Sequence, residues 1–231
     1  KIHKNSLSKT KPFFSLDKKI VGESHLKKIA RVSKFLKKNK SDYLFISASE
    51  NVAWLLNIRG FDNPNSPIPN CRLLINDKGK FYIITDKTKL SSLFKEKRIK
   101  KKQVIDEKNF EETINKLNRG KIIIDSKTCS LFFENLFKKN FKILDKKDPI
   151  YLFKAIKNKS EIKHMINAHI LDGVALTRFL YWIKVSNKKK ISEFDAQNKL
   201  ESFRKNNKQY LFPSFNTIAG TAENAAIVHY R

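Results

Sequence analysis

Apolar residues recur along the chain with the spacing of alternating helices and strands. Between Glu23 and Lys38 they stand three or four positions apart among lysines, which predicts an amphipathic helix. Short apolar runs predict strands, and helical spacing returns between them. We expect strands at 43–46, 104–105, 122–124 and 141–144, and helices at 49–56, 87–96, 109–118 and 129–138. This alternation predicts a layered α/β domain that ends near Pro149.

Turn-forming residues set the expected ends of these elements. Ser49 stands where an N-cap would begin the helix that runs to Leu56, and we expect Gly60 to end that helix. Prolines at positions 64, 67 and 69 then predict an irregular loop. Asn76–Lys80 separates two apolar runs, and Gly79 within it is typical of a β-hairpin turn.

After the layered domain the pattern predicts two helices and a strand-rich tail. Apolar residues at three- and four-residue spacing indicate a long helix over 159–185, which Lys188–Lys190 would break. Ser192 with Asp195 resembles a capping box, which predicts the start of a second helix. Strands are expected from about Phe212 onward.

The chain is strongly basic, with 49 Lys and Arg against 22 Asp and Glu and a formal net charge of +27. Such a charge first suggests nucleic acid or an anionic membrane as a partner. The lysines, however, are scattered along the whole length, and few of the cations are Arg, which nucleic-acid readers favour for forked contacts. We therefore interpret the lysine runs at 37–40, 99–102 and 188–190 as solvated faces and expect no nucleic-acid partner.

The cysteine content and the hydropathy of the chain limit the cellular compartments in which we expect the protein. Cys71 and Cys129 are far apart in the sequence, so a disulfide framework is not indicated and a reducing compartment fits. No apolar run approaches the roughly 20 residues that cross a bilayer. We expect a cytoplasmic protein with no membrane partner.

The C-terminal residues carry the most suggestive chemistry. The small residues at 219–222 would let the backbone approach a ligand closely, because Gly accepts dihedral angles that other residues avoid. The apolar strand expected after them delivers His229, and a neutral imidazole can give or take a proton near pH 7. From the residues alone, a hydrogen-bonded core histidine remains an open alternative.

Three blocks of the chain carry recognisable motifs in a fixed order. They are 49–62 (SENVAWLLNIRGFD), 155–176 together with 191–196, and 215–230 (FNTIAG…NAAIVHY). Together these blocks closely resemble the Xaa-Pro aminopeptidases (aminopeptidase P) of the creatinase/methionine aminopeptidase superfamily, peptidase family M24. The resemblance spans most of residues 20–231.

The resemblance implies a fold and a role for His229. Residues 1–18 would be a linker or the tail of a preceding domain. Residues 19–153 would form a creatinase N-terminal-like α/β domain with ribonuclease H-like layers, and 154–231 the first helices and strand of an incomplete pita-bread α+β catalytic domain. In the complete enzyme His229 would contact the scissile carbonyl region and stabilise the tetrahedral intermediate; it is not expected to bind a metal.

The resemblance also implies a pair of divalent metal ions, usually manganese. In that family two Asp, one His and two Glu after the matching histidine hold the metals, and no sequence after Arg231 remains to supply them. Because the chain also begins at Lys1 and not at Met, we interpret it as a piece of a longer enzyme, inactive by itself. The implied substrate is a peptide with proline at position two, and a homodimer is compatible with the family.

Other candidate residues are interpreted as structural. Tyr230 and Asn224 would hold the expected strand and turn. His164 and His169 are five positions apart and so share no helical face as a zinc pair would; His169 falls on the apolar stripe and is predicted to pack there. Asp172 has no carboxylate partner at a useful spacing for acid–base chemistry.

Arg59 and Asp62 flank Gly60 at the start of the proline-rich loop. We favour an ion pair that orders this loop over a lining of the approach to a catalytic pocket. Trp54 is predicted to be a core residue.

Two other functions remain open. The chain could be a non-catalytic creatinase-like module for dimerisation or another interaction. A weaker alternative is a basic nucleic-acid binder, which predicts tight and steeply salt-dependent binding.

Overall fold

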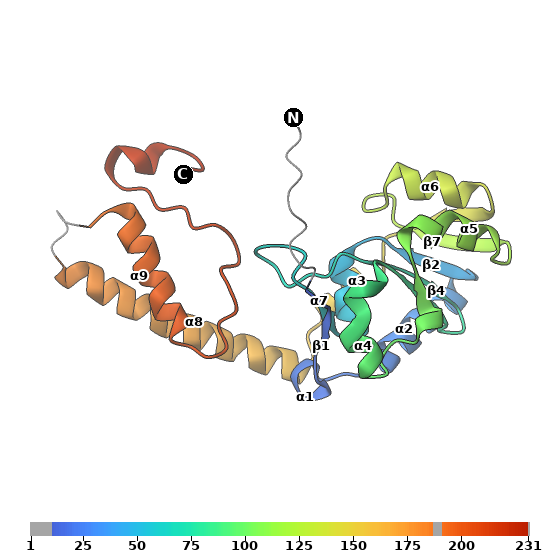
Figure 1. Ribbon diagram of the computed structural model, residues 1–231, viewed down its shortest axis with the longest axis horizontal. Helices are drawn as coiled ribbons and strands as arrows, with labels where there is room; N and C mark the ends of the chain where they lie inside the picture. The colour runs from blue at the N-terminus through green and yellow to red at the C-terminus, as the bar shows by residue number, and fades with distance from the viewer. Residues whose placement is uncertain (1–10, 187–190, 231) are drawn as a thin grey trace. The chain divides into compact units, whose positions relative to one another are not determined.

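The computed structural model describes residues 11–186 and 191–230. The chain divides into two compact units, Lys1–Ser160 and Glu161–Arg231, which are described separately (Figure 1). The break predicted at Lys188–Lys190 lies outside the described residues. No helix in the described ranges combines the length and the apolar character that crossing a membrane requires.

Unit 1 is built on a mixed sheet with the strand order β6-β5-β4-β2-β7-β8. The strands are β2 (Tyr43–Ile46), β4 (Arg72–Asn76), β5 (Phe81–Ile84), β6 (Val104–Ile105), β7 (Gly120–Ile124) and β8 (Phe141–Asp145). β4 pairs antiparallel with β2 and β5, whereas the pairs β2–β7, β7–β8 and β5–β6 are parallel. The predicted strands and the β4–β5 hairpin are confirmed, and Gly79 in its turn has the positive φ of 78° that favours glycine.

Side chains of each strand alternate between two cores, one on each face of the sheet. In β2, Leu44 and Ile46 lie in one cluster and Phe45 in the other. Helices α2 (His25–Lys38), α3 (Ser49–Leu56) and α4 (Ser91–Lys95) belong to the first cluster, and α5 (Phe110–Asn115) and α6 (Leu131–Lys138) to the second. Figure 1 shows α5 and α6 together on one side of the sheet. Burial on both faces explains why the strands are continuous apolar runs, and it confirms the layered α/β prediction.

Short elements complete unit 1. They are β1 (Phe14–Ser15), β3 (Ile58–Arg59), α1 (Lys18–Val21), α7 (Ile150–Ala155) and the 3₁₀ turns η1 (Lys87–Leu90), η2 (Lys101–Gln103) and η3 (Glu107–Asn109).

The ends of α3 differ from the prediction. Ala48 occupies the N-cap position, and Ser49 is the first helical residue, whose Oγ instead donates to the carbonyl oxygen of Cys71 at 3.0 Å. The helix ends because Asn57 adopts a left-handed φ of 55°, a conformation that asparagine tolerates. The helix stop expected at Gly60 is therefore supplied earlier in the chain.

Gly60 allows the segment around Phe13 to pack closely against the chain. A Cβ at Gly60 would lie 2.8 Å from the Cα of Pro69 and 2.9 Å from a ring carbon of Phe13. Phe13 is 0% exposed and belongs to the core, and β1 beside it pairs antiparallel with β3. The part of the expected linker that is described thus contributes to the fold of unit 1.

The described residues of unit 2 form two α-helices and a long C-terminal segment. Helix α8 (Lys159–Val185) has the predicted bounds, α9 (Glu193–Lys205) follows, and η5 (Ala222–Ala226) is a short 3₁₀ turn. Ser192 and Asp195 form the predicted capping box of α9. The only residue that α8 buries among those described is Ala175.

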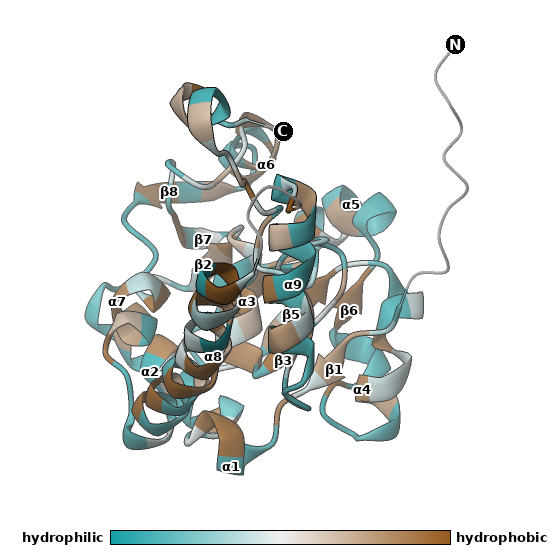
Figure 2. Cartoon of the chain, turned by 90° about the vertical axis from the view of Figure 1, so that its left-hand side faces the viewer, coloured by the Kyte–Doolittle hydropathy of each residue, from teal (hydrophilic) through white to brown (hydrophobic). Residues whose placement is uncertain are grey.

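The apolar stripe of α8 is exposed (brown in Figure 2). Its exposed members include Ile162, Ile166, Leu176 and Leu180. His169 is exposed as well, with its Nδ1 2.8 Å from the carbonyl oxygen of Met165. The prediction that His169 packs in a core is wrong, because the described residues of unit 2 cover little of this helix.

Candidate functional site

His229 lies in the turn after η5, and its side chain is exposed. Its backbone φ is 57°, in the left-handed region that residues with a Cβ seldom adopt. The predicted strand that was to deliver His229 is wrong: the described residues from 212 to 230 form no strand. A strand needs a neighbouring strand to satisfy its backbone groups, and this segment bonds to itself and to α9 instead.

Glu193, in the first turn of α9, joins the loop that carries His229. Its Oε1 accepts a hydrogen bond from the backbone nitrogen of Thr221 at 2.6 Å, and Nδ2 of Asn224 lies 3.3 Å from each carboxylate oxygen. Asn224 Nδ2 also lies 3.0 Å from the hydroxyl oxygen of Tyr230. The negative charge of Glu193 raises the pKa of Tyr230, and burial acts in the same direction.

Asn224 and Tyr230 therefore hold a turn, as predicted, but no strand. Glu193 was missed as a site residue by the sequence reasoning, although it stands inside one of the blocks of resemblance. A glutamate in the first turn of a capped helix is common, so its position alone is a weak indication of a functional site. Its partner Thr221 is separated from it by 28 positions, and only the folded chain brings the two together.

Gly220 permits a tight return of the chain. A Cβ at this position would lie 2.9 Å from the carbonyl oxygen of Asn224 and 3.2 Å from the Cα of Ala225. The close approach that the small residues allow is thus to the chain's own backbone. Residues 219–221 also line a hollow of about 360 Å³, together with side chains that include Ile183 and Ala196.

Asp172 is bound in an ion pair that ties α8 to α9. Its two carboxylate oxygens accept hydrogen bonds from Nε and Nη2 of Arg204 at 2.6 and 3.2 Å. The paired carboxylate raises the pKa of Arg204. A structural role accounts for Asp172. His164 is exposed on the same helix, like His169.

The proline-rich loop of unit 1 is ordered by Asp62. Its carboxylate accepts hydrogen bonds from Nζ of Lys89 at 2.7 Å and from the backbone nitrogen of Asn70 at 2.6 Å. Arg59 donates to backbone carbonyl oxygens within its own segment. An ion pair thus orders the loop, but the partner of Asp62 in it is Lys89 and not the predicted Arg59. Trp54 is half-buried against the core.

A metal pair needs several carboxylate and imidazole ligands in one place. Within 11–186 and 191–230, no three His, Cys, Asp or Glu side chains are grouped so that they could hold a metal ion. Cys71 and Cys129 are free and buried, and burial raises the pKa of Cys129 to about 11. The residues that the structure describes therefore do not fit a metal pair by themselves.

Comparison with known proteins assigns both units. Residues 4–161 match the Creatinase/Prolidase N-terminal domain family, and residues 163–231 match metallopeptidase family M24. Xaa-Pro aminopeptidase 1 of Dictyostelium discoideum is 32% identical over 225 residues, which are 94% of this chain and 35% of that protein. A probable Xaa-Pro aminopeptidase P of Laccaria bicolor is 32% identical over 227 residues, again 94% of this chain and 35% of the relative.

A solved structure shares the fold. The X-prolyl aminopeptidase of Caenorhabditis elegans, described as a cytosolic enzyme with a di-nuclear active site, matches with a TM-score of 0.78 at 24% identity. The match covers 90% of this chain and 35% of that one. The chain thus spans about a third of the length of the curated relatives that it matches. It belongs to the creatinase/prolidase N-terminal domain family and continues into a segment of metallopeptidase family M24.

Proposed function

We propose that this chain is part of a metal-dependent exopeptidase that hydrolyses the bond between the N-terminal residue of a peptide and a following proline. The observation that carries the proposal is the likeness to Xaa-Pro aminopeptidase 1, which runs through both units over 94% of the chain. Because the chain spans 35% of that relative, the proposal concerns the activity of a longer protein.

The substrate class explains why a dedicated site is needed. The nitrogen of a bond to proline carries no hydrogen, so a peptidase cannot recognise this amide by its N–H group. The proline ring also restricts the backbone of the residue before it. A site for this bond must therefore hold the peptide by its carbonyl oxygen and its free amine.

His229 is the residue that we assign to the carbonyl oxygen. Its exposed imidazole stands on a loop that is anchored at Thr221 and Tyr230, so it can be presented to a peptide without being buried in a core of its own. A donor held against the oxygen that gains charge in the transition state contributes about 10²–10³ in kcat. We propose that role for His229.

The proposed function includes metal ions, but their ligands are not among the described residues. We propose a pair of Mn²⁺ ions held by carboxylates and one imidazole from sequence other than this chain, in keeping with the absence of a suitable group of ligands within 11–186 and 191–230. No step assigned to His229 passes through them. We further propose that the enzyme is cytoplasmic. We also propose that it forms a homodimer, which light scattering of the complete protein would test.

The coding sequence beyond Arg231 and an assay of this chain together test the proposed function. We expect the sequence to continue with two Asp, then a His and two Glu. We expect the 231-residue chain with Mn²⁺ to release no residue from an Xaa-Pro tripeptide above a heat-killed control. A continuation without those residues would favour a non-catalytic interaction module, and turnover by the chain alone would overturn the assignment of the metal ligands.

A further inference from the structure

We propose that Glu193 is a positioning residue for His229, because its carboxylate binds the loop that presents the imidazole at Thr221 and Asn224, and Asn224 extends this contact to Tyr230 beside His229. The inference rests on the proposed function, which gives His229 its task. Glu193 itself touches no reacting atom in this proposal. It acts through the geometry of the loop.

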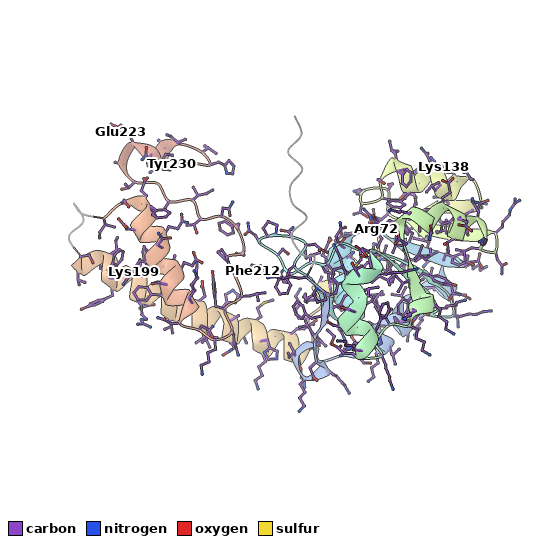
Figure 3. All side chains as sticks on the ribbon, in the orientation of Figure 1. Arg72, Lys138, Lys199, Phe212, Glu223 and Tyr230 are labelled. Carbon is purple, nitrogen blue, oxygen red and sulfur yellow. The ribbon has the colours of Figure 1, made fainter. Side chains whose placement is uncertain are left out.

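Two groups of the loop bind this one carboxylate, and a third is linked to it through one of them. Thr221, the N-cap of η5, binds it through its backbone nitrogen at 2.6 Å and fixes the start of the loop. Tyr230, next to His229, is joined to the carboxylate through Asn224, whose Nδ2 lies 3.0 Å from the Tyr230 hydroxyl oxygen, and the charge of Glu193 raises the pKa of Tyr230. Asn224 lies between them in sequence, and its amide group links the carboxylate to the hydroxyl of Tyr230. In Figure 3, Tyr230 lies on the side of the loop that faces α9, and Glu223 lies on the outer side.

The loop needs such a fastening because apolar packing does not hold it. Ile227 and Val228, which precede His229, are 54% and 83% exposed. Ala222 and His229 both have left-handed φ angles, 48° and 57°. Residues with a Cβ keep this conformation only when surrounding contacts enforce it. The bonds of Thr221 and Asn224 to Glu193 enclose Ala222, and backbone hydrogen bonds within the loop, such as Tyr230 N to the carbonyl oxygen of Ile227, hold the turn at His229.

Glu193 is well placed to act as a fixed point. It occupies the first turn of α9, directly after the N-cap Ser192, whose reciprocal bonds with Asp195 fix the start of the helix. A negative charge is favourable at this end of a helix. Thr221 and Asn224 both donate hydrogens to it, and a carboxylate accepts on both oxygens. A neutral amide at position 193 would turn its own hydrogens toward Asn224 or Tyr230.

The geometric part can be tested in the 231-residue chain. We compare Glu193→Ala and the isosteric Glu193→Gln with a control, Glu223→Gln, which removes a carboxylate from the same loop on its outer side. In Glu193→Ala we expect amide exchange of Thr221 to speed up by about tenfold, as for a lost charge-assisted hydrogen bond. The pKa of Tyr230 is measured from the change in the spectroscopic signal of its phenol group with pH, which Tyr230→Phe identifies by removing it. This pKa should fall toward its ordinary value in both Glu193 variants. Unchanged exchange and an unchanged Tyr230 signal would overturn the inference.

The functional part uses the complete enzyme that contains this chain. We expect Glu193→Gln to lower kcat roughly tenfold or more with KM changed by less than about threefold, because small misplacement of a reacting group is costly. Glu223→Gln should match the wild type. If the wild type itself shows no Xaa-Pro turnover, the proposed function fails. The amide exchange data still test whether Glu193 holds the loop. If the wild type is active and both Glu193 variants keep its kcat, the positioning role is refuted.

Discussion

Lys28 provides a sharp test of how unit 1 is held together. This residue of α2 is 1% exposed, although it carries a charge. Its Nζ donates to the carbonyl oxygen of Trp54 at 2.9 Å and to Oδ1 of Asn57 at 2.7 Å, and it lies 3.9 Å from the centroid of the Trp54 ring. Both acceptors stand at the C-terminal end of α3, where the helix dipole favours a cation.

Lys28→Met keeps most of the apolar stem and removes the ammonium group. Each charge-assisted hydrogen bond contributes about 1.5–3 kcal/mol, and a desolvated cation–π contact about 2 kcal/mol. Burial of the ammonium opposes these gains at a cost of several kcal/mol. The variant leaves the buried Oδ1 of Asn57 without this donor, which costs about 1–3 kcal/mol. We therefore expect the free energy of unfolding of unit 1 to fall by about 2–3 kcal/mol.

Urea unfolding followed by tryptophan fluorescence measures this loss. Because the chain has 2 Trp, a Trp182→Phe background leaves Trp54 as the reporter of unit 1. Lys27→Met is the matched control, since Lys27 is the exposed neighbour on the same helix, and its effect should stay within about 0.5 kcal/mol. A Lys28→Met chain as stable as the wild type would show that the contacts of the ammonium do not exceed its burial cost.

Three further predictions concern unit 2 and the buried groups of unit 1. Gly220→Ala should speed amide exchange over residues 221–226, because the added Cβ would lie 2.9 Å from the carbonyl oxygen of Asn224. Gly173→Ala, whose Cβ would meet no atom within 4 Å, should instead stabilise α8 by about 0.5–1 kcal/mol. Equal amide exchange over 221–226 in the two variants would contradict this contrast. Burial raises the pKa of Asp148, so its contribution to stability is greatest below its unfolded pKa of about 3.9 and is lost as pH rises through the folded value. Asp148→Asn should remove that loss in urea titrations between about pH 4 and 7, and an unaltered pH dependence would refute the assignment. Because burial raises the pKa of Cys129 to about 11, its thiol should react slowly with a thiol reagent at about pH 8 until the chain is unfolded; rapid reaction of the folded chain would speak against its burial.

Elements with local signals could be predicted from the sequence. The strands of unit 1 are short apolar runs, continuous because both faces of the sheet are buried, and their length and the turn residues around them distinguish them from helices. The hairpin turn was fixed by Gly79, and the start of α9 by Ser192 and Asp195. In each case the sequence signal lies within a few positions along the chain.

Features that depend on distant residues could not be predicted in this way. Ser49 donates to Cys71 in place of capping α3, and Asn57 ends the helix before Gly60 is reached. The apolar stripe of α8 predicted a buried face, but its burial depends on what covers it, and His169 is exposed for the same reason.

The candidate site shows the same division. The resemblance singled out His229 from its motif, but not its conformation, because strand formation depends on a neighbouring strand. Among the described residues the loop is set instead by Glu193, through bonds to groups 28 and 31 positions away. Such a contact leaves no periodic pattern in the sequence.

The central claim is that His229 faces the substrate of an Xaa-Pro exopeptidase. Its most direct test is kcat/KM of the complete enzyme for a tripeptide with proline at position two, measured for the wild type, His229→Ala and the exposed control His169→Ala. We predict turnover by the wild type, a loss of about 10²–10³-fold in His229→Ala, and no change in His169→Ala. Equal turnover by His229→Ala and the wild type would contradict the account.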